Sequence, residues 1–192
     1  MNATTLIRWG GLAYSIAGVT LVLQQGHELV AGSSTTSTWV ALHVVGYIGL
    51  ALGLIGFVAI FEHQFARLGP LGVWGFIVGF LGNGLTGGAA FLNAFVVPVA
   101  PDLAKSTGPI FTGPAAGVIG VAALLVTVGF VMFGVATYRA GQLPRWAAVL
   151  TIAGAWFGPA AALATTAFDV GGIVFGLGAI GLGWGVWRSS NN

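Results

Sequence analysis

Hydrophobic residues run through this chain in six long stretches, which are separated by short segments rich in polar residues, proline or glycine. Each stretch approaches the roughly 20 apolar residues that a helix needs to cross the hydrocarbon core of a membrane. The segments of about ten alternating apolar and polar residues that a membrane β-barrel needs are absent. The pattern therefore predicts an all-α, polytopic transmembrane bundle, one domain over residues 1–192, with six helices at 6–24, 40–61, 71–97, 115–138, 146–164 and 170–187.

Composition strengthens this interpretation. Of the 192 residues, 57% are hydrophobic and 5% are charged, and the mean hydropathy is +0.97. A soluble domain carries about 25% charged residues. The sequence pI of 9.5 rests on six scattered basic residues without a basic stripe, so we expect no nucleic-acid partner. There are no cysteines, which excludes disulfides, thiolate metal sites and cysteine nucleophiles.

The basic residues predict the orientation in the membrane. With the N-terminus inside, one face receives Arg8, Arg67, Arg139, Arg145 and Arg188, and the other receives Lys105. The positive-inside rule then places both termini in the cytoplasm. Tryptophans are expected at the interfaces as anchors, with Trp39 on the outer face and, on the inner face, Trp9, Trp74, Trp146, Trp184 and Trp187.

Two sets of similar segments suggest an internal repeat. The three outward helices begin IRWGGLAYSIAG at Ile7, ARLGPLGVWGFIVG at Ala66 and PRWAAVLTIAG at Pro144. The three returning helices carry GYIGLALG from Gly46, GVIGVAAL from Gly117 and GIVFGLGAIG from Gly172. These matches predict three tandem helical hairpins of equal orientation, an arrangement that occurs in transport proteins without implying transport.

Small residues form stripes along the returning helices. They are Gly46, Gly49, Gly53 and Gly56 on the second helix, Gly117, Gly120, Thr127 and Gly134 on the fourth, and Gly172 and Gly176 on the sixth. Because lipid provides no hydrophobic force between helices, close backbone approach is what makes a bundle compact. We expect these stripes to mediate helix packing within the chain, and the same faces could dock other membrane subunits.

The third predicted helix carries a polar face. Asn83, Thr86 and Asn93 recur at helical spacing, so they should point into the bundle, where each amide needs a hydrogen-bond partner. The run GNGLTGG over 82–88 is a poor helix, which predicts a kink or an unwound segment. Hydrogen bonding between helices is the simpler explanation of this face, and a ligand site at an unwound segment is the alternative.

Three of the four carboxylates and two of the three histidines map to the outer side. The predicted turn after the first helix carries Gln24, Gln25, His27 and Glu28, and His43 lies about one turn into the second helix. Asp102 and Lys105 lie in the loop after the third helix. Asp169 is expected to cap the N-terminus of the sixth helix.

This cluster could support several chemistries. His27 and His43 could clamp a haem iron or a chlorophyll-type magnesium, and with Asp102 or Asp169 they could instead hold zinc. No HxxxH or HExxH spacing supports either metal site, and a histidine near a membrane interface is more often a hydrogen-bonded interfacial residue. The candidate ligand-binding residues are Asn83, Thr86, Asn93, His27, Glu28 and His43. There is no recognisable catalytic motif, so no catalytic residue is assigned.

Four segments together resemble a broad group of uncharacterised small bacterial membrane proteins with six predicted helices. They are RWGGLA near the start, the GLG-like returns, FLNAFVVPVAPDLA, and YRAGQLPRWAAVLTIAG. The resemblance implies a location in the bacterial plasma membrane, and it supplies no site residue.

These observations favour a non-enzymatic membrane protein in contact with membrane lipids. It would be either an accessory subunit of a membrane complex or a binder of a small apolar or lipid-like molecule. The alternatives are a haem- or pigment-binding electron-transfer protein that uses His27 and His43, and a transporter of a small neutral solute along the polar face of the third helix.

Overall fold

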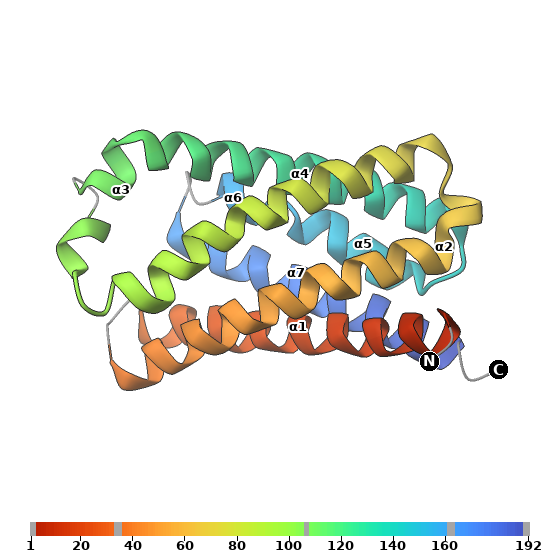
Figure 1. Ribbon diagram of the computed structural model, residues 1–192, viewed down its shortest axis with the longest axis horizontal. Coiled ribbons are helices and arrows are strands. Elements are labelled where there is room, and N and C mark those ends of the chain that lie inside the picture. Colours follow the sequence, from red (N-terminus) through yellow and green to blue (C-terminus); the bar gives the residue numbers. More distant parts are fainter. Residues whose placement is uncertain (1–2, 33–35, 106–107, 161–163, 190–192) are drawn as a thin grey trace.

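The computed structural model describes residues 3–32, 36–105, 108–160 and 164–189, and the regular elements in these ranges are all helical. The prediction of an all-α protein is confirmed. In chain order (Figure 1) the elements are α1 (Ala3–Ala31), α2 (Ser37–Phe91), the π-helix η1 (Leu92–Val96), the 3-10 helix η2 (Pro101–Ala104), α3 (Pro109–Thr112), α4 (Pro114–Ala140), α5 (Arg145–Gly154), α6 (Phe157–Ala160) and α7 (Thr165–Ser189).

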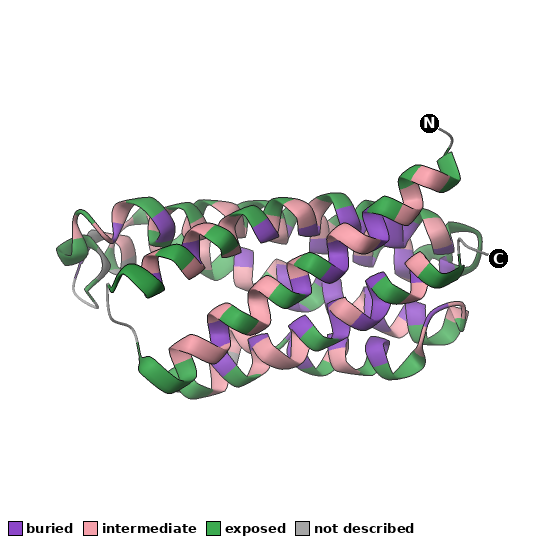
Figure 2. Ribbon diagram, turned by 90° about the horizontal axis from the view of Figure 1, so that it is seen from below, coloured by how far each residue is buried: buried purple, intermediate pink, exposed green. Residues whose placement is uncertain are grey.

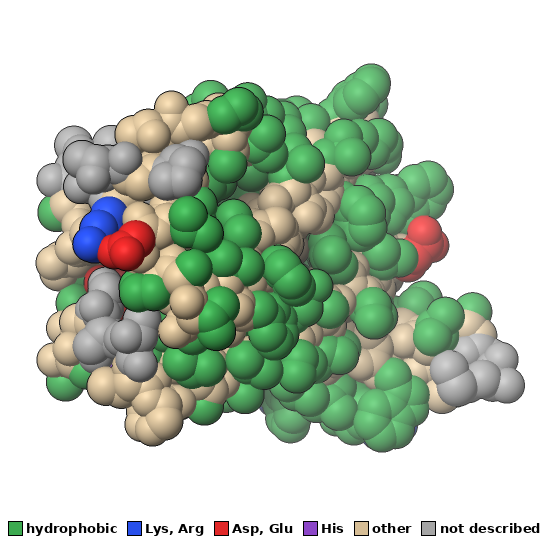
Figure 3. All heavy atoms as spheres, turned by 60° about the vertical axis from the view of Figure 1, so that its left-hand side comes forward, with side chains coloured by type: hydrophobic (Ala, Val, Ile, Leu, Met, Phe, Trp, Pro, Cys, Tyr) green, Lys and Arg blue, Asp and Glu red, His purple; other side chains and the backbone are tan. Residues whose placement is uncertain are grey.

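Four helical segments within these ranges are long and apolar enough to cross a membrane: Ala3–Ala31, Ser37–Val96, Pro114–Ala140 and Thr165–Ser189. Large hydrophobic side chains are exposed along all four, including Leu23, Ile55, Leu124 and Leu177. Figure 3 shows hydrophobic side chains over much of the visible side surface. Because such a surface is unfavourable in water, the fold fits an integral membrane protein.

α2 contains two of the six predicted segments. It divides at Gly69, whose backbone is not helical (φ 61°, ψ −175°), and Pro70 opens the helix that follows. This backbone region is essentially restricted to glycine, and proline is favoured at the first position of a helix because its missing N–H is not needed there. The first limb (37–68) and the second limb (70–91) therefore run in opposite directions (Figure 1).

The unwound segment that the sequence suggested at 82–88 is not found, because the backbone there is helical. The second limb is helical through this run, and Thr86 Oγ1 donates a hydrogen bond to the carbonyl of Gly82 at 2.9 Å. The irregularity comes later, in η1, where the Val97 N–H donates to the carbonyl of Leu92 at 2.9 Å. Pro98 explains the position, because its ring would clash with a carbonyl of a regular α-helical turn and it has no N–H to donate.

Several helices also begin or end at residues other than those predicted from the sequence. α1 continues to Ala31, so the polar run after position 24 is helical and is not a turn. α7 begins at Thr165, so Asp169 lies inside the helix and does not cap it. The segment predicted at 146–164 is interrupted by a turn at residues 155–156, ahead of Pro159, and its residues 161–163 lie outside the described residues.

Glycines set the order of the helices around the bundle. A Cβ at Gly56 would overlap the backbone of Tyr14 (first limb against α1), and one at Gly129 would overlap the backbone of Gly79 (α4 against the second limb). A Cβ at Gly18 would overlap the carbonyl of Gly176, which joins α1 to α7. Further glycine contacts join α4 to α5 and α5 to α7, so the bundle closes on itself through backbone approach, as expected for helices in lipid.

Only some of the predicted stripes of small residues pack against another helix of the chain. Gly46, Gly49, Gly53 and Gly56 face α1, as the packing interpretation requires. On α4, Gly134 packs against α5, and Thr127 donates to the Ala155 carbonyl at 2.9 Å. Gly117 and Gly120 have no atom close to where a Cβ would stand, so the outer part of that stripe does not pack within the described chain.

The packed core lies in the half of the bundle that holds both termini, which we call the terminal end. Its largest fully buried hydrophobic side chains are Phe57, Ile60, Phe130, Phe133, Leu182 and Val186. The Phe57 ring centroid lies 4.7 Å from that of Phe130 and 4.8 Å from that of Phe133. Buried residues are concentrated in this half and become sparse toward the opposite end (Figure 2), which we call the cavity end.

Candidate binding cavity

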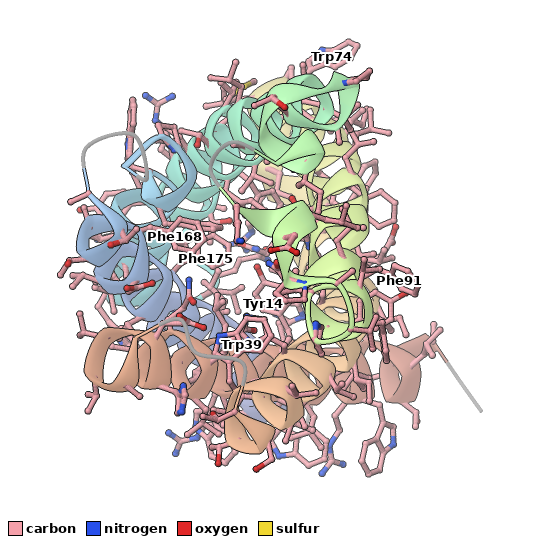
Figure 4. The ribbon with its side chains drawn as sticks, turned by 90° about the vertical axis from the view of Figure 1, so that its left-hand side faces the viewer. Tyr14, Trp39, Trp74, Phe91, Phe168 and Phe175 are labelled. Atoms are coloured by element: carbon pink, nitrogen blue, oxygen red, sulfur yellow. The ribbon has the colours of Figure 1, made fainter. Side chains whose placement is uncertain are left out.

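The cavity end of the bundle encloses a cavity of about 730 Å³. It is bordered by α1, both limbs of α2, α4, α6 and α7, so all the long helices contribute to its wall. Seen along the bundle from this end (Figure 4), Tyr14, Trp39 and Phe175 lie around the central space, whereas Trp74 and Phe91 lie on the periphery. A volume of 300–1,000 Å³ is the usual range for small-molecule sites.

The deep part of the cavity is apolar. It is lined by Tyr14 from α1, Val126 and Phe130 from α4, and Phe175 and Ala179 from α7. Phe130 and Phe175 meet edge to face, with ring centroids 4.8 Å apart. Because Phe130 also belongs to the packed core, the floor of the cavity is the upper surface of that core.

The polar residues lie nearer the cavity end and come from three helices. They include Gln24, Gln25 and Glu28 on α1, His43, Tyr47, Asn83 and Thr86 on α2, and Thr165, Thr166 and Asp169 on α7, together with Asn93 on η1 and Lys105 after η2. The extension of α1 to Ala31 produces the α1 group, because residues 24, 25 and 28 of a helix share one face. The cavity is thus apolar at one end and polar at the other.

His43 occupies the centre of a short chain of contacts. Its Nδ1–H donates to the Trp39 carbonyl at 2.9 Å, one helical turn earlier, which leaves Nε2 directed to Glu28. The distance from Nε2 to Glu28 Oε1 is 3.6 Å, too long for a hydrogen bond and short enough for an ion pair if the ring is protonated. Both side chains are largely buried, at 7% exposure for His43 and 13% for Glu28.

Trp39 holds His43 and its contacts in place and is not an interfacial anchor. Its side chain is 5% exposed, and its ring stacks on the His43 ring with centroids 3.6 Å apart. Thr36 caps the helix here by accepting a hydrogen bond from the Trp39 N–H at 3.3 Å. The expectation of an outer anchor at Trp39 is therefore wrong. Trp9, Trp74, Trp146 and Trp184 are exposed near the terminal end, as expected of anchors. Trp187 is half-buried, and its ring contacts the ring of Trp9.

Asp169 is the second carboxylate of the cavity. It is 9% exposed, and neither a hydrogen bond nor an ion pair joins it to another described residue. Glu28 lies close enough for the two negative charges to interact. The carboxylate oxygens of Asp169 are not among the buried side-chain atoms that lack a partner, so they remain accessible from the cavity that Asp169 lines.

Asn83, Thr86 and Asn93 all line the cavity, as does the neighbouring residue Ala90. Asn93 is an exposed residue within η1, so it lies at the open part of the wall. A π-helical turn changes the direction of the side chains that follow it, and such turns are frequent at functional sites. The polar face predicted for the third helix is thus directed toward a cavity and away from the packed helix contact with α4.

The remaining predicted residues lie elsewhere. His27 is not among the residues that line the cavity, although five of the six candidate residues are. Asp102 is exposed and pairs with Lys105, whose hydrogen bond and positive charge lower the pKa of the Asp102 carboxyl. Within the described residues there is no group of three His, Asp or Glu side chains that could hold a metal ion, so the geometry offers no support for the zinc alternative.

Several lining residues were not assigned to the candidate site from the sequence. Tyr47 is one, and its ring contacts those of Phe91, at the end of the second limb, and Phe95, in η1, at centroid distances of 6.0 and 5.6 Å. Asp169 and Gln25 are others, both buried and both in helix segments that the sequence prediction treated as loop or helix end. The four-residue spacing of Trp39 and His43 was the available signal for the contact between them.

Comparisons of this chain with protein-family models, with curated proteins and with solved structures find no match. The functional proposal therefore rests on the cavity and the residues around it.

Proposed function

We propose that this protein is a non-enzymatic integral membrane protein that binds a small apolar or lipid-like molecule in the cavity. The single observation that carries the proposal is the shape and polarity of the 730 Å³ space. Aromatic and aliphatic side chains form its floor, and amide, hydroxyl and charged side chains gather toward its outer end. An amphiphile with an apolar body and a polar head matches this gradient.

The wall beside the two limbs of α2 supports a ligand that comes from the lipid. Tyr47 borders the cavity, and its ring contacts Phe91 and Phe95, which are 47% and 43% exposed on the outer surface. Tyr47, Phe91 and Phe95 thus form an aromatic wall between the cavity and the outer surface of the bundle. Movement of these rings would open a path from the bilayer.

The same proposal includes a topology. The two limbs of α2 and the interrupted α5–α6 segment add to the other long helices to make six passages through a bacterial plasma membrane, with both termini in the cytoplasm. Both termini lie at one end of the bundle (Figure 1), as an even number of passages requires. The cavity then opens toward the outer side.

The packed core favours binding over transport. Below the cavity floor, Phe57, Ile60 and Leu182 are fully buried at 0% exposure, so a solute would meet close-packed side chains. Transport of a small neutral solute would require this half of the bundle to rearrange. The haem or pigment alternative has weaker geometric support, because His27 lies outside the lining and His43 faces Glu28. An absorption spectrum of the protein from its native host tests it.

An accessory-subunit role is the second candidate function, and one observation favours it. Gly117 and Gly120 on α4, and Gly84 and Gly88 on the second limb, have open space where their side chains would stand. Glycines in membrane helices commonly mark close helix contact, and a helix of another subunit could supply that contact. Crosslinking in native membranes would test this role independently of ligand binding.

A substitution that fills the cavity tests the main proposal. Ala90→Trp places a large ring in the cavity, and we expect it to abolish co-purification of small molecules, as measured by native mass spectrometry and by organic extraction. Ala51→Trp is the matched control, because Ala51 is exposed on the outside of the first limb and the ligand should be retained. If the wild-type protein binds no lipid or apolar molecule in membranes or in lipid nanodiscs, the proposal is wrong.

A further inference from the structure

We infer that the cavity selects an amphiphile with a positively charged head, an inference that rests on the proposed function. The head is held between the carboxylates of Glu28 and Asp169, and the apolar body lies on the aromatic floor of the cavity. The ligand class is a lipophilic ammonium or similar organic cation.

The first step of the argument concerns charge. Glu28 and Asp169 approach the cavity from α1 and α7, two helices that pack together through Gly18 and Gly176. Asp169 is 9% exposed and has no hydrogen-bond or ion-pair partner among the described residues. A cation would stabilise a carboxylate in this environment, and the cavity is the space from which one can approach.

The second step concerns the cations that the chain itself could supply. Lys105 lies on the rim of the cavity, but its ammonium group is paired with exposed Asp102. His43 faces Glu28 and can neutralise at most one of the two carboxylates. The arginines in the described helices lie near the terminal end, at the start of α1 and α5, beside Gly69, and at the last turns of α4 and α7. His27 lies close enough to His43 for their charges to interact, but it does not line the cavity. Among the described residues, no cationic side chain is therefore paired with Asp169.

The third step concerns the surfaces next to these carboxylates. Trp39, Tyr47 and Phe168 all line the cavity, and Figure 4 shows Trp39 and Phe168 at different positions around the central space. Aromatic faces attract organic cations and tolerate their apolar substituents. A head that is both positive and bulky is thus favoured over a small inorganic ion, in agreement with the absence of a three-ligand metal group among the described residues.

Two probes of matched shape and opposite charge test the inference. The full chain in lipid nanodiscs is titrated with tetraphenylphosphonium and with tetraphenylborate, and binding is measured by calorimetry. We expect saturable one-to-one binding of the phosphonium, competition by dodecyltrimethylammonium, and at least tenfold weaker binding of the borate.

Three variants locate the site. Glu28→Gln and Asp169→Asn should each weaken phosphonium binding at least tenfold. Glu62→Gln removes an exposed acidic residue of the first limb beyond the packed core, so it should bind like the wild type. To separate loss of binding from loss of fold, the melting temperature is measured with and without phosphonium. Asp169→Asn should melt at or above the temperature of the ligand-free wild type and should lose the ligand-induced increase.

The outcomes separate this inference from the function on which it rests. Binding of a neutral amphiphile such as dodecanol in the cavity, blocked by Ala90→Trp, combined with no preference for the phosphonium over the borate, would overturn the inference and leave the proposed function standing. Phosphonium binding that is unchanged in both Glu28→Gln and Asp169→Asn would also overturn it. Absence of binding by every probe would overturn both.

Discussion

At the scale of single residues, the glycines of this chain have different surroundings, although they look alike in the sequence. Gly129 on α4 is buried, and a Cβ there would overlap the backbone N and Cα of Gly79. Gly120 lies on the same helix with open space at the corresponding point. The sequence could indicate that glycine faces exist, but it could not show which of them touch another helix, because that depends on the rotation of both partners.

Gly129→Ala and Gly120→Ala should consequently change stability in opposite directions. The first forces α4 away from the second limb and should lower the free energy of unfolding by about 1–3 kcal/mol. The second removes a flexible residue from an exposed helix position and should raise it by up to about 1 kcal/mol. Thermal unfolding in detergent, followed by size-exclusion chromatography, measures both. Equal effects of the two substitutions would contradict this account of α4.

At the scale of elements, the interruption between α5 and α6 illustrates how one residue type determines a break. In an uninterrupted helix the carbonyl of Ala155 would accept from residue 159, which is a proline without an N–H. Thr127 Oγ1 on α4 approaches this carbonyl at 2.9 Å and donates to it, while also lying 2.9 Å from the Ala123 carbonyl. A side chain of the neighbouring helix thus replaces the missing backbone donor.

Thr127→Val should lower the free energy of unfolding by about 1–2 kcal/mol, because it leaves a buried carbonyl without a donor while keeping the side-chain shape. Thr127→Ser keeps the hydroxyl and is the control, with an effect that reflects only the lost methyl group. The difference between the two variants in chemical unfolding measures the hydrogen bond. If the valine variant were as stable as the serine variant, the break would not depend on this contact.

At the scale of the whole molecule, both chain termini and the turn at Gly69 lie at one end, and the cavity opens at the other (Figure 1). The chain has no cysteine, so a single cysteine can report on each end. Ala31 ends α1 at the cavity end, and Ala66 lies near the Gly69 turn; both are exposed.

In intact cells, a membrane-impermeant maleimide should label Ala31→Cys and should not label Ala66→Cys. Permeabilised cells should give labelling of both variants, which controls for reactivity. The reverse pattern in intact cells would show that the arginine-rich end faces outward, contrary to the orientation expected from the positive-inside rule.

The helical class and the apolar spans followed from the sequence because hydrophobicity over about 20 residues is a property of the residues themselves. The inward-facing position of Asn83 and Thr86 followed from helical spacing. The cavity could not be predicted from the sequence, because it depends on how far α1 extends past residue 24 and on where α7 begins. Local propensity also overstated the effect of the glycines at 82–88, because that segment is helical although only Gly82 among them packs closely against α4.

The division between a packed terminal end and a hollow cavity end has a consequence for how this protein can change. In a filled core, a smaller side chain leaves a void and costs stability, whereas a side chain that already borders open space can be exchanged with little penalty. Residues such as Thr86, Ala90 and Asn93 border that space, and none of them belongs to the core around Phe57. The fold can therefore acquire new specificities at its hollow end while its packed end preserves the architecture, which makes the chain a natural starting point for redesigned receptors within a membrane.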